Sequence, residues 1–357
     1  MYQGFTWSSV VFWLALLFTN VVPAQQTPQQ AQTSSSAALP DLRGVAVWGV
    51  HDPSMIKAGN TWYVFSSGGR RDGPQLPVLC STDLLAWAHC GHIFDAIPPW
   101  ILARLPAVKE LWAPNISFAD GEYRLYYCYS VLGKTSSGIA LVTNKTLDRT
   151  SPDYSWVDHG PVLETKEGDD YNAIDPNFLR DSSGSDWLVF GSFWDGIKLR
   201  RLAPDGMPSP ADKKLYSLAR RTPPSFTEWP APGNSAPWQA IEGPFLVQHD
   251  GFFYLFTSWD HCCLGADSNY HVVVGRADSV TGPYRDELGH KLTNGGGTTI
   301  LAGDAHWAGP GGQSVWMDPD GQDILVYHAY DHDDGRVALR LAPLLWQNGW
   351  PVVQGGP

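Results

Sequence analysis

Residues 51–65 read HDPSMIKAGNTWYVF. A residue pair and a proline come first, followed by a short apolar run, a turn at Gly59-Asn60 and an aromatic strand. Glycine and asparagine accept the positive φ angles that tight hairpin turns need. This stretch therefore predicts a β-hairpin whose first strand begins next to Pro53.

The same pattern occurs five times along the chain. The prolines that mark it lie 61 to 68 residues apart: Pro53, Pro114, Pro176, Pro244 and Pro310. A repeat of this length suits a four-stranded sheet with its loops, and radial repetition of such sheets builds a β-propeller. We predict an all-β fold, a five-bladed β-propeller, over residues 43–357. The alternative, chance similarity among the hairpins of a β-sandwich, is disfavoured by five evenly spaced copies.

Composition narrows the class of partner. The 357 residues carry a net charge of −12 and no Lys/Arg-rich run, which argues against nucleic acid or an anionic membrane surface as a partner. Aromatic residues make up 13% of the chain, so most of it is not disordered. A neutral glycan fits this composition better.

The N-terminal segment reads as a targeting signal. Residues 10–18, VVFWLALLF, are apolar but too few to span a bilayer, and small residues precede Gln25. We predict a signal peptide over residues 1–24, a flexible linker rich in Gln, Ser and Thr over residues 25–42, and a secreted, extracellular protein. A membrane anchor or a buried strand is the alternative.

Five cysteines leave one without a partner. In an oxidising compartment, Cys80 and Cys90 could close a short loop, and the neighbours Cys262 and Cys263 could form a bridge in a distorted turn. Cys128 lies in an aromatic run and is expected to be a buried free thiol. The alternative is that all five are reduced.

Acidic residues stand at three of the repeat starts. Asp52 and Asp175 each precede the marker proline, and Glu242 stands two residues before Pro244. In a propeller these positions face one end of the central channel, so the three carboxyl groups should converge and push their pKa values apart. A pair of such carboxyl groups is what a glycoside hydrolase needs. The alternative is that each Asp only caps its turn.

At these residues the sequence resembles glycoside hydrolase family 43, and within it the endo-1,5-α-L-arabinanases. The matching stretches are spread along nearly the whole of residues 43–357: VHDPSMIK (50–57), ELWAPNIS (110–117), YNAIDPNFLRD (171–181), FGSFWDGIKL (190–199), AIEGPFLV (240–247), CCLG (262–265), TGPY (281–284), NGGGTTIL (294–301) and LVYHAYD (325–331). The resemblance implies hydrolysis, with inversion, of the α-1,5-linked arabinan found in plant cell-wall pectin.

The resemblance also implies roles for individual residues. Asp52 would be the general base, Glu242 the general acid, and Asp175 the carboxylate that orients the acid and tunes its pKa. We expect substrate contacts from four further residues: Trp112, Asn172, Ser192 and Phe193. For each aromatic residue, packing within a blade is an equally good interpretation.

One departure from the family concerns a metal. Many arabinanases have a histidine that helps hold a central ion, often calcium, where this chain has Gly312. We therefore predict that no cofactor is required, although a central calcium ion is a second possibility, with His306 or His328 as replacement ligands. The alternative functions are an exo-acting α-L-arabinofuranosidase or β-xylosidase with the same fold, and a non-catalytic glycan-binding propeller.

Overall fold

The computed structural model describes residues 1–4, 39–222, 239–319 and 321–354, and one compact unit spans residues 38–357. Most of the predicted signal peptide and linker, residues 5–38, lies outside the described residues. In the described part of the chain, no helix has both the length and the apolar character needed to cross a bilayer.

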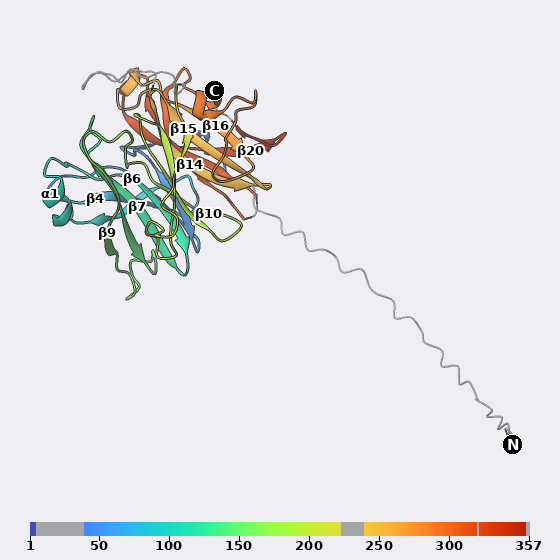
Figure 1. Ribbon diagram of the computed structural model, residues 1–357. Coiled ribbons are helices and arrows are strands. Elements are labelled where there is room, and N and C mark those ends of the chain that lie inside the picture. The colour runs from blue at the N-terminus through green and yellow to red at the C-terminus, as the bar shows by residue number, and fades with distance from the viewer. Residues whose placement is uncertain (5–38, 223–238, 320, 355–357) are drawn as a thin grey trace, which may run out of the picture. The chain divides into compact units, whose positions relative to one another are not determined.

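Five antiparallel sheets form the blades of a propeller, as the repeat predicts (Figure 1). Blade I contains β2 (Ser54–Ala58), β3 (Thr61–Phe65), β4 (Gln75–Ser81) and β5 (Ala88–Phe94). Blade II contains β6 (Trp112–Ala119), β7 (Glu122–Ser130), β8 (Ser137–Asn144) and β9 (Val157–Thr165). Blade III contains β10 (Asn177–Arg180), β11 (Asp186–Phe190), β12 (Ile197–Arg201) and β13 (Leu215–Ala219).

The C-terminal part of the chain forms the other two blades. Blade IV contains β14 (Ile241–His249), β15 (Phe252–Trp259), β16 (His271–Ala277) and β17 (Thr298–Leu301). Blade V contains β18 (Trp307–Trp316), β19 (Ile324–Asp331) and β20 (Val337–Gln347), and β21 (Trp350–Val353) also pairs with β20. The described helices are short: α1 (Pro99–Arg104), η1 (Leu42–Gly44), η3 (Gly265–Asp267) and η4 (Leu292–Asn294).

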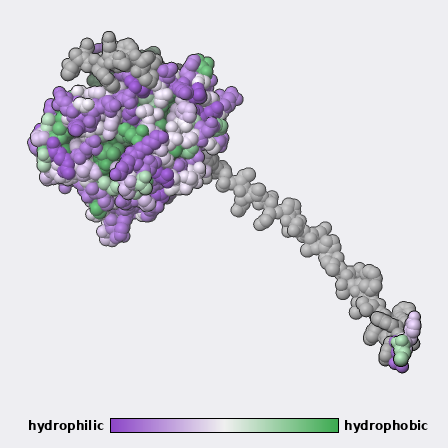
Figure 2. Space-filling model, viewed as in Figure 1, coloured by the Kyte–Doolittle hydropathy of each residue, from purple (hydrophilic) through white to green (hydrophobic). Residues whose placement is uncertain are grey.

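The hydrophobic core is divided among the gaps between neighbouring blades. Blades I and II share one cluster of buried side chains, which includes Phe65, Leu125 and Tyr127. Four similar clusters fill the other gaps between blades. Both faces of each blade are therefore covered by a neighbour, which explains the almost continuously apolar middle strands such as β11. On the face drawn in Figure 2, hydrophobic residues form small groups among hydrophilic ones.

The ring is closed by the N-terminal part of the chain. Strand β1 (Val47–Trp48) pairs with β20 and completes blade V, with Val47 opposite Leu339. Leu42 is 1% exposed in the cluster between blades V and I, and Arg340 donates a hydrogen bond of 2.6 Å to the carbonyl oxygen of Val45. The repeat analysis did not predict this strand, because two residues carry no periodic signal.

An unusual backbone angle marks the start of every blade. The residue before each marker proline has a positive φ: Asp52 (47°), Ala113 (44°), Asp175 (56°), Gly243 (55°) and Gly309 (52°). For residues other than glycine this conformation costs about 1–3 kcal/mol and needs support from its surroundings. Because the same angle recurs five times, equivalent residues of the five blades are presented to the central channel in the same way.

The two predicted cysteine pairs are present as disulfides. Cys80–Cys90 joins β4 to β5 with a Cα–Cα distance of 5.8 Å, and Cys262–Cys263 joins neighbouring residues whose Cα atoms are 3.8 Å apart. Cys128 is a buried free thiol, as expected.

Candidate active site

One end of the central channel collects residues from every blade. A cavity of about 40 Å³ is lined by the residues that flank the marker prolines, among them Asp52, Ala113, Asp175, Gly243 and Gly312. The prediction that the repeat starts share one cavity is therefore confirmed for these positions. The three acidic residues, Asp52, Asp175 and Glu242, are each partly exposed, so solvent reaches all of them.

Asp52 is held by two donors on one of its oxygens. Ser67 donates from its hydroxyl to Oδ2 at 2.6 Å, and Nδ1 of His51 lies 2.9 Å from the same oxygen. Burial alone would raise the pKa of Asp52, but the charge and hydrogen bond of His51, with smaller contributions from His328 and Ser67, lower it well below its usual value. Asp52 is therefore ionised at neutral pH, and Nδ1 of His328 lies 3.7 Å from its other oxygen, Oδ1.

The pKa of Glu242 is shifted in the opposite direction from that of Asp52. Burial, reinforced by the negative charge of Asp52, raises the pKa of Glu242 to about 7, even though the hydroxyl of Ser192 donates to Oε2 at 2.6 Å and favours the ionised form. The hydroxyl of Tyr270 donates to the other oxygen, Oε1. A carboxyl group with this pKa keeps its proton in mildly acidic solution, as a general acid must.

Asp175 lies next to the start of β14. Its Oδ2 accepts a hydrogen bond of 3.1 Å from the backbone N–H of Gly243, the residue that follows Glu242. Burial, and then the charges of Glu242 and Asp52, raise the pKa of Asp175 well above its usual value. Like charges in one site repel each other, so Asp175 and Glu242 together keep at least one proton at neutral pH.

The residues predicted to contact substrate lie in different surroundings. Ser192 is buried and bound to Glu242, so it holds the acid directly. Asn172 is also buried, and its Oδ1 has no hydrogen-bond partner within the described residues. Phe193 is partly exposed, with its ring centre 6.0 Å from that of His261, and Trp112 is half-buried against the core shared by blades II and III.

The groups around Asp52 do not fit a calcium ion, which prefers six to eight oxygen ligands. His51 and His328 are the residues that could join Asp52 around a metal, and both offer nitrogen. Nδ1 of His328 already accepts the backbone N–H of Asp52 at 3.1 Å, and a Cβ on Gly312 would lie 2.5 Å from the His328 ring and 2.6 Å from Asp52. His306 lies in an exposed segment. Gly312 thus leaves room for His328, and we assign no step to calcium.

We expect a chelator to change the activity little. Incubation with EDTA followed by an assay on linear arabinan should leave kcat within about twofold, because the donor set is nitrogen-rich and calcium prefers oxygen. A large loss that calcium alone restores would contradict this interpretation.

Four functional contacts were not predicted from the sequence. Ser67 and His51 hold Asp52, Tyr270 holds Glu242, and the Tyr330 hydroxyl lies 2.7 Å from Nε2 of His51. His51 and Tyr330 lie in the family motifs HDPS and LVYHAYD, and these motifs are the sequence signal that could have identified them. Ser67 and Tyr270 stand in no motif that distinguishes them.

Comparison with known proteins identifies the family. The model of glycosyl hydrolases family 43 matches residues 45–351. An extracellular exo-α-(1→5)-L-arabinofuranosidase of Cellvibrio japonicus is 39% identical over 85% of this chain and 86% of its own length, and an extracellular endo-α-(1→5)-L-arabinanase of Bacillus subtilis is 36% identical over 96% and 95%.

Solved structures agree with the sequence comparison. The structure of a Cellvibrio cellulosa α-L-arabinanase complexed with arabinohexaose superposes with a TM-score of 0.78 at 37% identity, covering 87% of this chain and 96% of the other. Its fold and its sequence both match the chain described above. The protein belongs to glycosyl hydrolase family 43 and is a glycoside hydrolase of the arabinanase/arabinofuranosidase group.

Proposed function

We propose that the protein is a secreted endo-1,5-α-L-arabinanase that hydrolyses arabinan with inversion of configuration. The observation that carries the chemistry is the pairing, at one end of the channel, of a carboxyl group whose pKa is about 7 (Glu242) with one whose pKa is well below the usual range (Asp52). Two carboxyl groups in environments that separate their pKa values are the mark of an acid and a base.

In the proposed mechanism, Glu242 protonates the glycosidic oxygen as the bond to the anomeric carbon breaks. Asp52 takes a proton, through Oδ1, from a water molecule that attacks the anomeric carbon from the opposite face. His51 and Ser67 keep Oδ2 occupied, and so fix the direction in which Oδ1 points. Asp175 holds the backbone beside the acid, and repulsion between the two carboxyl groups favours the state in which they share a proton.

Endo action is supported by the similarity to the Bacillus subtilis endo-arabinanase, which aligns over 96% of this chain. The Cellvibrio japonicus exo-enzyme is slightly more identical, at 39% against 36%, so exo action is the second candidate. Secretion is supported by the extracellular relatives and by the N-terminal sequence.

A digest of debranched linear arabinan separates these candidates. We expect a ladder of short arabino-oligosaccharides at early times, and ¹H NMR of the first products should give the anomer opposite to that of the substrate. Arabinose alone as the early product would contradict endo action, and retained configuration would contradict the roles of Asp52 and Glu242. A protein that binds arabinan without cleaving it would be a glycan-binding module.

The pH profile tests the assignment of Asp175. Because the acid must be protonated, kcat/KM should fall as the pH rises through about 7, the pKa of Glu242. Asp175→Asn removes the carboxyl group with which Glu242 shares a proton, so Glu242 should lose its proton at lower pH, which moves this limb to lower pH and reduces kcat near neutrality. A limb that stays in place would show that Asp175 does not tune the acid.

A further inference from the structure

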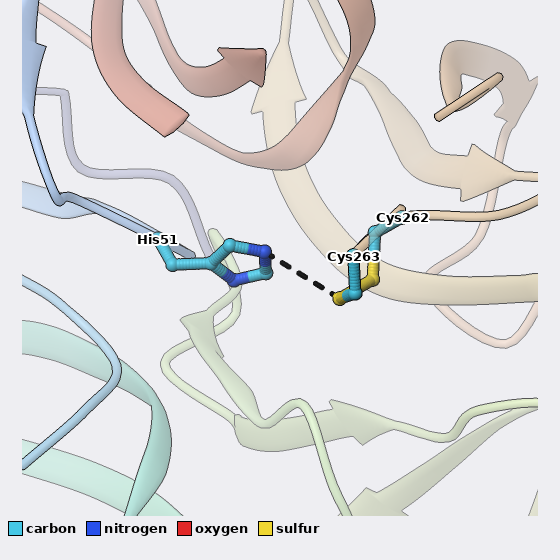
Figure 3. A group of neighbouring side chains, drawn as sticks. All are labelled: His51, Cys262 and Cys263. Atoms are coloured by element: carbon cyan, nitrogen blue, oxygen red, sulfur yellow. Dashed lines mark hydrogen bonds between the residues drawn. A yellow bond between two sulfur atoms is a disulfide. The ribbon is translucent and has the colours of Figure 1, made fainter. Parts of the chain in front are cut away.

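The vicinal disulfide lies between Glu242, the proposed acid, and His51, which holds the proposed base. Figure 3 shows Cys262 and Cys263 facing His51, and Sγ of Cys263 is 3.6 Å from Nε2 of that imidazole. Sγ of Cys262 is 4.0 Å from Oε1 of Glu242. Cys263 and Leu264 are exposed, so solvent reaches the disulfide beside the acid.

The backbone of this pair is also connected to the base. Cys263 has a φ of 68°, and its N–H donates to the Tyr330 hydroxyl at 2.9 Å. That hydroxyl lies 2.7 Å from Nε2 of His51, whose Nδ1 lies 2.9 Å from Oδ2 of Asp52. Burial lowers the pKa of His51, but the charge and hydrogen bond of Asp52 outweigh it and raise that pKa above its usual value, so both ring nitrogens carry a proton. Nδ1–H then donates to Asp52, and Nε2–H and the Cys263 N–H both donate to the Tyr330 oxygen.

We propose that the Cys262–Cys263 disulfide positions the catalytic base, acting through Tyr330 and His51 on Asp52. The S–S bond closes a small ring across one peptide unit and thereby fixes the direction of the Cys263 N–H. The fixed N–H orients the Tyr330 hydroxyl, whose oxygen in turn holds the His51 ring so that Nδ1–H points at Asp52. Cys263, Tyr330 and His51 are therefore positioning residues, and the oxidised pair is the form suited to catalysis.

The rings packed around His51 limit the groups that its two nitrogen atoms can contact. Its imidazole stacks on that of His328 with ring centres 3.8 Å apart. His328 is fully buried, and burial together with the nearby charge of His51 lowers the pKa of His328 well below its usual value, so His328 is neutral. Nδ1 of His51 therefore faces Asp52, and Nε2 faces the Tyr330 hydroxyl and Cys263.

The test reduces this disulfide and measures whether the resulting loss of kcat depends on Tyr330. Dithiothreitol supplies two electrons and two protons, so that the S–S bond becomes two thiols while the reagent closes to its own disulfide. The assay uses C80A/C90A, which removes the disulfide between β4 and β5, and the same protein carrying Y330F. Kinetics on linear arabinan are measured before and after reduction.

Reduction should lower kcat of C80A/C90A about tenfold with KM within twofold, a loss smaller than the ~10² that a misplacement of about 1 Å can cause. Y330F should lower kcat to a similar degree before reduction, and reduction should then add less than about twofold, because the connection is already broken. An unchanged kcat after reduction, or an equal loss with and without Tyr330, would overturn the proposal. If the disulfide only stabilised the loop, reduction would cause an equal loss of kcat with and without Tyr330.

Two further measurements keep the test decisive. If C80A/C90A does not fold, the wild type is reduced gradually, and alkylation with mass spectrometry identifies the stage at which only Cys262 and Cys263 are open. Because the inference rests on the proposed function, the ring N–H signals of His51 are also followed in ¹H–¹⁵N spectra, assigned with H51Q, as a readout of the Nδ1–H hydrogen bond to Asp52. Ring N–H signals that are the same before and after reduction overturn the positioning role, whereas a wild type without activity on arabinan contradicts only the proposed function.

Discussion

Glu242→Gln should reduce kcat on linear arabinan by about 10³-fold, within the range of about 10²–10⁴ that positioned acid–base groups contribute. Glutamine has nearly the shape of protonated glutamate, but it has no proton to give to the leaving oxygen. The hydroxyls of Ser192 and Tyr270 can still donate to its amide oxygen. We therefore expect the melting temperature to change by no more than about 3 °C, which corresponds to about 1 kcal/mol.

The choice of substrate makes this prediction specific. An aryl arabinofuranoside with an acidic phenol needs little help from an acid, so Glu242→Gln should impair its cleavage much less than that of arabinan. Glu287→Gln, in an exposed segment, is the matched control and should behave as the wild type. Equal losses on both substrates would assign Glu242 a role other than that of the acid.

Asp52→Asn should reduce kcat about 10⁴-fold, at the upper end of the range for acid–base catalysis, because a neutral amide cannot take a proton from water. Asparagine accepts a positive φ more readily than most residues, so the backbone at 47° should be retained. Its side-chain oxygen can still accept from Ser67 and His51. Circular dichroism and thermal unfolding should therefore match the wild type.

The loss in Asp52→Asn should not depend on the leaving group, since activation of water is needed for every substrate. This separates it from Glu242→Gln in the same pair of assays. Asp72→Asn, at an exposed position of blade I, is the matched control. Near-normal turnover by Asp52→Asn would contradict its assignment as the base.

The sequence was sufficient to predict the propeller because its signal is repeated. A single hairpin such as residues 51–65 is compatible with many β folds, but five copies at one spacing define a ring of blades. The same repetition placed Asp52 and Asp175 at one channel end, and the structure adds the reason: a shared positive φ before each marker proline.

The contacts around the carboxyl groups could not be predicted in this way. Ser67 follows β3 and Tyr270 precedes β16, and nothing in their own segments relates them to Asp52 or Glu242. Their roles depend on the packing of different blades at the channel. Ser192 is expected to contact the sugar, and the structure adds that its hydroxyl is bound to the acid, a contact that residue type alone does not predict.

The pairing of β1 with β20 has a consequence for the order of folding. It joins parts of the chain about 295 residues apart, as measured by the bond from Arg340 to Val45. A chain that emerges N-terminus first can assemble blades I to IV from neighbouring segments, but β1 has no partner until β20 has been synthesised. We therefore expect ring closure to be the last step of folding, and until then the edge of β20 is open to pairing with other chains and the apolar side of blade I is not covered by blade V.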